Sequence, residues 1–268
     1  MAPVIKTVQL HNQLSIPYAE QGDYSGTPLI LLHGYADSWH SFERLLLHMP
    51  YSVHTFAITQ RGHGDASRPV EGYSSYDFAG DLEAFMDKLG INNAVIAGGS
   101  SGGFAARRFA IDHPQRTKGL VLLGSPLSLR DKPAVLELWD STISKLTDPV
   151  DKNFVQEFVE STFIQQVPQE FIETLVQESL KVPARVWKAV LQGLLEDESA
   201  EEINKIQSPT LIVWGEQDTI VSRNEQETIA AAIPNSRLVV YPGAGHSLYC
   251  EEPARIASDL VAFIANID

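Results

Sequence analysis

Apolar residues along the chain form short continuous runs that alternate with longer stretches of helical spacing. Continuous runs over residues 28–34, 94–97 and 119–124 are typical of strands buried on both faces of a parallel sheet. Residues 75–89 carry their apolar side chains at the three- and four-residue spacing of an amphipathic helix. Strands that alternate with helices in this way predict crossover connections and a mostly parallel sheet.

The pattern predicts an α/β fold with a sheet of eight strands flanked by helices. The strands are expected over residues 4–10, 14–20, 28–34, 53–59, 94–97, 119–124, 209–215 and 237–241. The first two would form an edge hairpin through His11, Asn12 and Gln13. Helices are expected from Asp37 or Ser38 to Met49, over 75–89, from Phe104 onward, over 224–232 and over 253–267.

The alternation stops between Leu127 and Lys205, where only helical segments follow one another. They are expected over residues 134–146, 151–163, 169–178 and 183–195, each with a proline near its start. We therefore expect a core domain of residues 1–126 and 206–268, interrupted by an all-helical insertion of residues 127–205. Ligands of open parallel sheets bind at the carboxyl ends of the strands, so an insertion that leaves there would act as a lid.

Charge and cysteine content narrow the possible partners. A net charge of −14 argues against nucleic acid and anionic membranes as partners. Cys250, the single cysteine, cannot form an internal disulfide, as expected in a reducing cytoplasm. The first residues lack a basic region followed by a long apolar run, so neither a signal peptide nor a membrane anchor is expected. The expected location is cytoplasmic.

A glycine-rich turn follows the run at residues 94–97. Gly98-x-Ser100-x-Gly102 fits a nucleophile elbow, a tight strand-to-helix turn that lifts a serine above the sheet edge. The overlapping Gly99-x-Ser101-x-Gly103 satisfies the same pattern. We favour Ser100, because the strand ends at Ala97 and the chain must turn at once. The competing interpretation is a glycine-rich turn without chemistry.

An activated serine needs a base and a group that orients the base, and both follow strands later in the chain. Asp218, or alternatively Glu216, comes directly after the run that ends at Gly215. His246 comes after the last strand. The order Ser, Asp, His is the order of one hydrolase fold. A lone Asp or His after a strand is usually a turn or structural residue; their joint appearance in this order predicts a catalytic triad.

Several motifs resemble those of the α/β-hydrolases, over essentially the whole chain. They are Leu32-His33-Gly34-Tyr35-Ala36-Asp37-Ser38-Trp39, Gln60-Arg61-Gly62-His63-Gly64, the elbow, Trp214-Gly215-Glu216-Gln217-Asp218 and Gly243-Ala244-Gly245-His246. The chain is similar to the lidded branch that includes small esterases, lactonases, epoxide hydrolases and cofactor-free haloperoxidases. This resemblance implies that the backbone N–H groups of Tyr35 and Ser101 form an oxyanion hole.

Two positions depart from the pattern of those relatives. Gly99 stands where many have a bulky residue, often His, and Ala36 replaces the proline usual in epoxide hydrolases. The epoxide hydrolases and haloalkane dehalogenases that the chain resembles use Asp at the elbow, so Ser100 favours acyl chemistry.

The sequence therefore predicts a serine hydrolase of a small hydrophobic ester or lactone. Candidate pocket-lining aromatics are Tyr35, Trp39, Phe104, Trp139 and Trp187, of which the last four are candidates to bind substrate. For each of them, plain packing in the core or the lid is at least as good an explanation. No metal and no organic cofactor is expected, and the chain is expected to be a monomer or a homodimer. The alternatives are a carbon–carbon bond hydrolase or another cofactor-free reaction on the same triad, and a receptor-like ligand-binding protein with little turnover.

Overall fold

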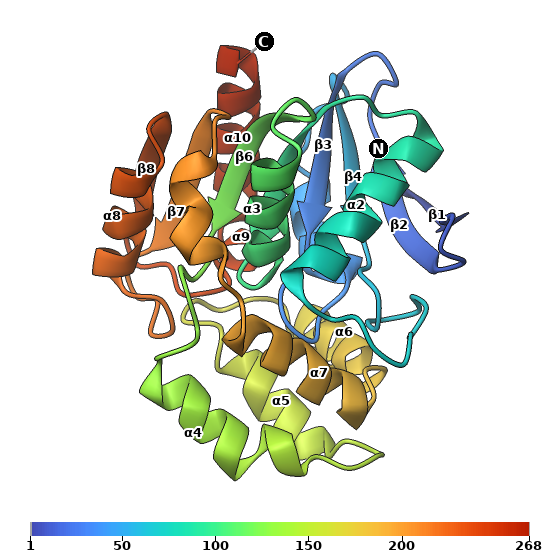
Figure 1. Cartoon of the computed structure of the whole chain (residues 1–268), viewed down its shortest axis with the longest axis vertical. Coiled ribbons are helices and arrows are strands. Elements are labelled where there is room, and N and C mark those ends of the chain that lie inside the picture. Colours follow the sequence, from blue (N-terminus) through green and yellow to red (C-terminus); the bar gives the residue numbers. More distant parts are fainter. Residues whose placement is uncertain (1, 268) are drawn as a thin grey trace.

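Residues 2–267 are described by a computed structural model, and they form a single eight-stranded sheet with helices on both faces (Figure 1). The strands lie in the order β1-β2-β4-β3-β5-β6-β7-β8. β1 and β2 pair antiparallel, as do β2 and β4, and every other neighbouring pair is parallel. The strands are β1 Val4–Gln9, β2 Ser15–Gln21, β3 Thr27–Leu32, β4 Val53–Ile58, β5 Ala94–Gly99, β6 Thr117–Leu123, β7 Thr210–Gly215 and β8 Ser236–Tyr241. The predicted sheet is confirmed.

The central strands are apolar throughout because both of their faces are covered. Alternate side chains of β3 point to opposite faces, so that Leu29 and Leu31 join one buried cluster and Ile30 and Leu32 the other. Helices α2, α3 and α8 cover the face of Ile30, and α1 and α10 cover the face of Leu29. These helices are α1 Glu43–Leu46, α2 Ser75–Leu89, α3 Gly102–Asp112, α8 Arg223–Ala232 and α10 Pro253–Ile267, with the short α9 Leu248–Glu251 before α10.

Helix α2 has the predicted bounds because both of its ends are capped. Ser74 and Asp77 form a reciprocal capping box at its start, and Gly90 ends it in the left-handed conformation. The single helix expected from Asp37 or Ser38 to Met49 is wrong. The Ser38 side chain instead caps a 3₁₀ turn, η1 Trp39–Phe42, which leads into the four-residue α1.

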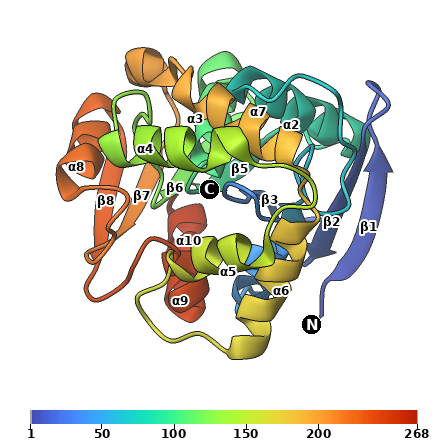
Figure 2. The same ribbon diagram turned by 90° about the horizontal axis from the view of Figure 1, so that it is seen from below.

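Between β6 and β7 the chain is helical, and this helical insert (residues 127–205) lies across the end of the sheet opposite to the C-terminus (Figure 1). Its elements are α4 Pro133–Ser141, η2 Ile143–Lys145, α5 Lys152–Glu160, α6 Gln169–Leu180, α7 Ala184–Leu195 and η3 Ser199–Lys205. Figure 2 looks onto this end, with α4 and α5 in front of the strands. Two of the expected helices are shorter than predicted, since α4 gives way to a 3₁₀ turn and α5 stops at Glu160. Within residues 2–267, no helix combines the length and the apolar character that crossing a bilayer requires.

Candidate active site

Ser100 stands on a sharp turn between β5 and α3, with a backbone φ of 48° that non-glycine residues rarely adopt. Its N–H donates to the Leu123 carbonyl oxygen of the neighbouring strand, at 2.9 Å. A Cβ on Gly98 would lie 2.5 Å from the Gly102 carbonyl carbon, so the turn closes only around glycine. This geometry holds the Ser100 side chain above the carboxyl end of β5.

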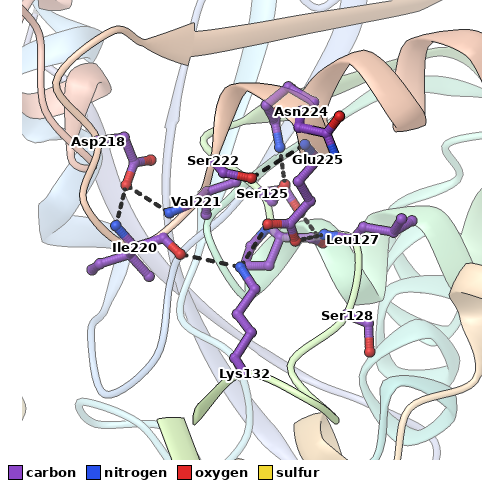
Figure 3. Close-up of polar contacts among 12 residues, drawn as sticks. Ser125, Leu127, Ser128, Lys132, Asp218, Ile220, Val221, Ser222, Asn224 and Glu225 are labelled. Carbon is purple, nitrogen blue, oxygen red and sulfur yellow. Dashed lines mark hydrogen bonds and ion pairs between the residues drawn. The ribbon is translucent and has the colours of Figure 1, made fainter. Parts of the chain in front are cut away.

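Ser100, His246 and Asp218 form a continuous chain of hydrogen bonds. The Ser100 hydroxyl lies 2.8 Å from His246 Nε2, and His246 Nδ1 lies 2.9 Å from Asp218 Oδ2. The Asp218 side chain is fully buried, and its other oxygen accepts the N–H groups of Ile220 and Val221 at 2.8 and 2.9 Å (Figure 3). Because the carboxylate can only accept, Nδ1 carries the proton and Nε2 is free to accept from the serine.

Ser101 and Glu216, the alternatives to Ser100 and Asp218 that the sequence left open, make no hydrogen bond to His246. Ser101 is the N-cap residue of α3 and makes no side-chain capping bond. Glu216 is exposed, in the loop that begins after β7. The structure thus brings Ser100 and Asp218, rather than these neighbours, into contact with His246.

The turn at Gly34 and Tyr35 lies beside Ser100, and the buried His33 fixes its orientation. A Cβ on Gly34 would lie 3.4 Å from Ser100 Cβ. The Gln60 N–H donates to His33 Nε2 at 2.9 Å, so His33 Nδ1 carries the proton and donates to the Gly34 carbonyl oxygen at 2.8 Å. Burial and the nearby His63 hold the pKa of His33 well below its usual value, which keeps the ring neutral. The Gly34 carbonyl shares a peptide plane with the Tyr35 N–H, so His33 also sets the direction of that N–H.

Among residues 2–267, neither the Tyr35 N–H nor the Ser101 N–H donates a hydrogen bond to the rest of the chain. Both residues line the same cavity as Ser100. Backbone N–H groups beside a reactive serine can stabilise negative charge that develops on a substrate oxygen.

A cavity of about 540 Å³ opens over Ser100, between the sheet edge and the helical insert. Its apolar lining comes mainly from the insert, which also supplies polar residues such as Lys132 and Glu157, and the loops at the strand ends add Ser100 and His246. The apolar lining includes Leu129, Val135, Leu138, Phe154, Phe158, Val159, Phe163, Leu175, Leu191 and Leu194. Asp37 also lines this cavity, and burial raises the pKa of its carboxyl to about 7. A small, largely apolar ligand fits such a space.

The four aromatic residues predicted to bind substrate lie elsewhere than on this wall. Trp187 is fully buried, packs edge-on against Tyr35 and accepts the Tyr35 hydroxyl hydrogen on its carbonyl oxygen. Phe104 is buried under the guanidinium of Arg107. Trp39 stacks on His40, and Trp139 packs against the core cluster. None of the four is among the residues that line the cavity, whereas Phe154 and Phe158, which the sequence analysis does not single out, do line it.

Two acidic residues near the site were also missed. From the sequence, Asp37 is named as a possible helix cap and as part of the motif that begins at Leu32, and no role is assigned to Glu251. Asp37 had an available signal in its position three residues after the His33-Gly34 turn. In the part of the chain that the structure describes, no three His, Cys, Asp or Glu side chains gather as metal ligands would.

Comparison with known proteins places most of the chain in one family. Residues 27–253 match the family model described as alpha/beta hydrolase fold. Similar curated relatives include the AB hydrolase superfamily protein YisY of Bacillus subtilis, 28 % identical over 89 % of this chain and 91 % of that protein. A non-heme haloperoxidase of Rhodococcus erythropolis is 27 % identical over 90 % of this chain and 93 % of its own length. The monoacylglycerol lipase abhd6-B of Xenopus laevis is 24 % identical over 95 % of this chain and 83 % of the lipase.

A solved structure has the same fold. The esterase EaEST of Exiguobacterium antarcticum superposes with a TM-score of 0.87 at 22 % identity, over 98 % of this chain and 100 % of the esterase.

Proposed function

The chain belongs to the α/β-hydrolase fold family, and we propose that it is a serine hydrolase of small carboxylic esters or lactones. The single observation that carries this proposal is the unbroken hydrogen-bonded chain from Ser100 through His246 to the buried Asp218. A serine hydroxyl becomes a nucleophile when a neighbouring base takes its proton and a third group orients the base.

The proposed reaction proceeds in two halves. As the Ser100 hydroxyl attacks the substrate carbonyl carbon, its proton moves to His246 Nε2, and Asp218 stabilises the imidazolium that forms. The tetrahedral intermediate collapses, His246 protonates the leaving alkoxide, and the acyl group stays on Ser100. Water then attacks the acyl-enzyme with His246 as base, which releases the acid and restores the serine. In a lactone the leaving alkoxide stays attached to the acyl group.

The proposed oxyanion hole consists of the Tyr35 and Ser101 N–H groups. Support comes from their position on the wall next to Ser100 and from the absence of another acceptor for either group within residues 2–267. Preorganised donors of this kind lower the barrier by about 3 to 4 kcal/mol each.

We further propose that the helical insert is the lid of this site and sets substrate choice. The insert supplies most of the apolar residues that line the cavity. An acyl or alcohol group of aliphatic or aromatic character would lie against Phe154, Phe158 and Leu138, with its carbonyl toward Ser100.

The test is covalent labelling with a fluorophosphonate, followed by intact mass and peptide mapping, together with a panel of esters and lactones. We expect one adduct on Ser100, its loss in Ser100→Ala, its retention in Ser101→Ala, and turnover of short or aromatic esters. Asp218→Asn should lower kcat by about 10⁴-fold, because the base would lose its orientation. Glu216→Gln is the matched control and should leave kcat near the wild-type value.

Two outcomes would replace the proposal. An adduct without turnover of any ester or lactone, but with tight ligand binding, would indicate a binding protein. Cleavage of carbon–carbon bonds without ester turnover would assign the same three residues to a different reaction.

A further inference from the structure

Two loops bring Asp218 and His246 to the site, and both loops are fastened to the helical insert. We call residues 216–222 the acid loop and residues 242–247 the histidine loop. Each loop is held to the insert by hydrogen bonds of a charged side chain. Neither of these side chains belongs to the hydrogen-bonded chain of Ser100, His246 and Asp218.

At the histidine loop the fastening group is the carboxylate of Glu251, which is only 8 % exposed. One oxygen accepts the N–H of Gly245, the residue before His246, at 2.6 Å. The other oxygen accepts the insert's Ile164 and Gln165 N–H groups at 2.6 and 3.1 Å. One buried carboxylate thus joins three backbone donors from two separate segments, and hydrogen bonds to a charged acceptor are the strong ones.

Further contacts close the same junction. The Ser247 N–H donates to the Thr162 carbonyl oxygen at 3.1 Å, and the two hydroxyls lie 2.9 Å apart. A Cβ on Gly245 would lie 2.8 Å from Ile164 Cγ1 and 2.9 Å from Glu251 Oε1. The histidine loop therefore contacts the insert on both sides of His246, through Gly245 and through Ser247.

At the acid loop the fastening group is Lys132, from the start of the insert (Figure 3). Its ammonium donates to the Ile220 carbonyl oxygen at 3.1 Å and to Glu225 Oε2 at 2.7 Å. The Ile220 N–H donates to Asp218, so this residue links the lysine directly to the acid. Glu225, on α8, also accepts the N–H of Leu127, the first residue of the insert, at 2.6 Å. One carboxylate therefore binds both Lys132 and the start of the insert.

We propose that Glu251 and Lys132 are positioning residues, each of which holds one of these loops against the insert so that the insert fixes the alignment of His246 and Asp218. The inference rests on the proposed function and adds that the insert supports the chemistry as well as the pocket. A shift of about 1 Å in a reacting group can cost about 100-fold in rate, so loosening either junction is expected to slow the chemical step.

Glu251→Gln and Lys132→Met test the two junctions. Glutamine keeps one acceptor oxygen and presents an N–H₂ group to donors on the other side, so one half of its junction opens. Methionine keeps most of the apolar stem against the cavity and removes both hydrogen bonds. Lys132→Arg keeps the charge and the donors.

Lys181→Met is the matched control. Lys181 also belongs to the insert and forms an ion pair with Asp65 on the core at 2.9 Å, but it contacts neither loop. The Lys181→Met substitution removes an ammonium group that links the insert to the core, as Lys132→Met does, but at a distance from both loops.

The measurements are kcat and KM on the best ester of the panel and the rate at which a fluorophosphonate phosphonylates Ser100, with urea midpoints to confirm folding. We expect Glu251→Gln and Lys132→Met to lower kcat and the phosphonylation rate about 10- to 100-fold, with KM within about threefold of wild type. Lys132→Arg should restore most of the loss, and Lys181→Met should change neither rate by more than about twofold.

Distinct outcomes separate the inference from the proposed function. A wild-type protein that is neither labelled by the fluorophosphonate nor active overturns the proposed function. An active wild type whose Glu251→Gln and Lys132→Met variants fall no further than Lys181→Met overturns the positioning role alone. A rise in KM at unchanged kcat also overturns it, since it would make these residues part of the pocket wall only.

Discussion

Gly102 lies so close to Leu32 that a Cβ at position 102 would stand 2.3 Å from the Leu32 carbonyl oxygen. The first turn of α3 is thereby pressed against the end of β3. Only a residue without a side chain permits this approach, which brings Ser100 to the sheet edge. We predict that Gly102→Ala lowers the free energy of unfolding by about 1 to 3 kcal/mol, because the backbone must shift to admit the methyl group. It should also lower the rate at which a fluorophosphonate labels Ser100.

Gly80→Ala provides the control for that prediction. Gly80 is an exposed position inside α2, and a Cβ there would meet nothing within 4 Å. Alanine should stabilise the helix by about 0.5 to 1 kcal/mol. Urea denaturation of both variants measures the expected loss of stability for Gly102→Ala and the expected gain for Gly80→Ala. A Gly102→Ala protein as stable and as reactive as wild type would contradict the close approach of α3 to β3.

A second prediction concerns His33, which holds the Gly34 carbonyl through Nδ1 and accepts the Gln60 N–H through Nε2. The amide nitrogen of Asn can take the place of Nδ1, whereas the Gln amide reaches toward Nε2. We expect His33→Gln to lose up to about 100-fold in kcat, because the Tyr35 N–H is no longer aimed, and His33→Asn to lose less. Steady-state kinetics at matched folded fractions make the comparison. Equal losses would show that His33 does not act through the Gly34 peptide.

A third prediction follows from His63, whose pKa burial lowers to about 4. Below the ordinary pKa of about 6.5 the unfolded chain binds a proton at this residue that the folded chain does not bind. The stability that His63 contributes is therefore complete above about pH 7, falls as the pH is lowered, and is lost near pH 4. The difference of about 2.5 pH units corresponds to about 3 kcal/mol.

The His63→Asn variant isolates this effect, because an Asn amide can still donate to the Arg61 carbonyl oxygen that accepts from His63 Nδ1. Urea denaturation between pH 7 and pH 4 should give a smaller loss of stability for the variant than for wild type. Parallel pH curves for the two proteins would refute the assignment.

A fourth prediction concerns Asp37, whose contribution to stability should change with pH in the direction opposite to that of His63. Burial raises the pKa of its carboxyl to about 7, so the folded chain holds a proton between about pH 4 and pH 7 that the unfolded chain has released. Its contribution to stability is greatest in acid and declines as the pH rises toward 7. We expect Asp37→Asn to gain stability over wild type as the pH rises from 5 to 8, by at most about 1.4 kcal/mol per pH unit.

The change is conservative, because the Asn oxygen can still accept the Ser38 N–H that Asp37 accepts at 2.8 Å. Denaturation at pH 5 and pH 8 is sufficient. A stability difference between the two proteins that stays constant with pH would show that Asp37 titrates in its ordinary range.

The sheet and the meeting of Ser100, Asp218 and His246 could be predicted because both depend on local pattern and on one geometric rule. Parallel strands end at a common edge, so residues that directly follow β5, β7 and β8 had to lie near one another. The bounds of α2 could also be predicted from the sequence, because the capping residues Ser74 and Gly90 mark its two ends.

The cavity wall could not be predicted in the same way. Whether an aromatic residue of the insert faces a ligand or the core depends on how α5 and α7 pack. Trp187 turned inward, with its ring 5.0 Å from Tyr35 and 5.2 Å from Phe158. The path of the chain after α5 depends on a partner 87 residues away, because the Ile164 N–H donates to the Glu251 carboxylate. No local pattern carries that information.

The buried apolar residues of the insert, such as Val159, Leu175 and Trp187, belong to the same contiguous cluster as Leu31 and Val121 on the sheet face covered by α10. The insert thus has no separate interior to melt on its own. It and the sheet should unfold in one cooperative step, and replacing it by a short linker would leave one side of that shared interior open to water. Exchange of this segment with that of a relative would then require matched substitutions beneath it on the sheet, so the segment is a poor module for transplantation.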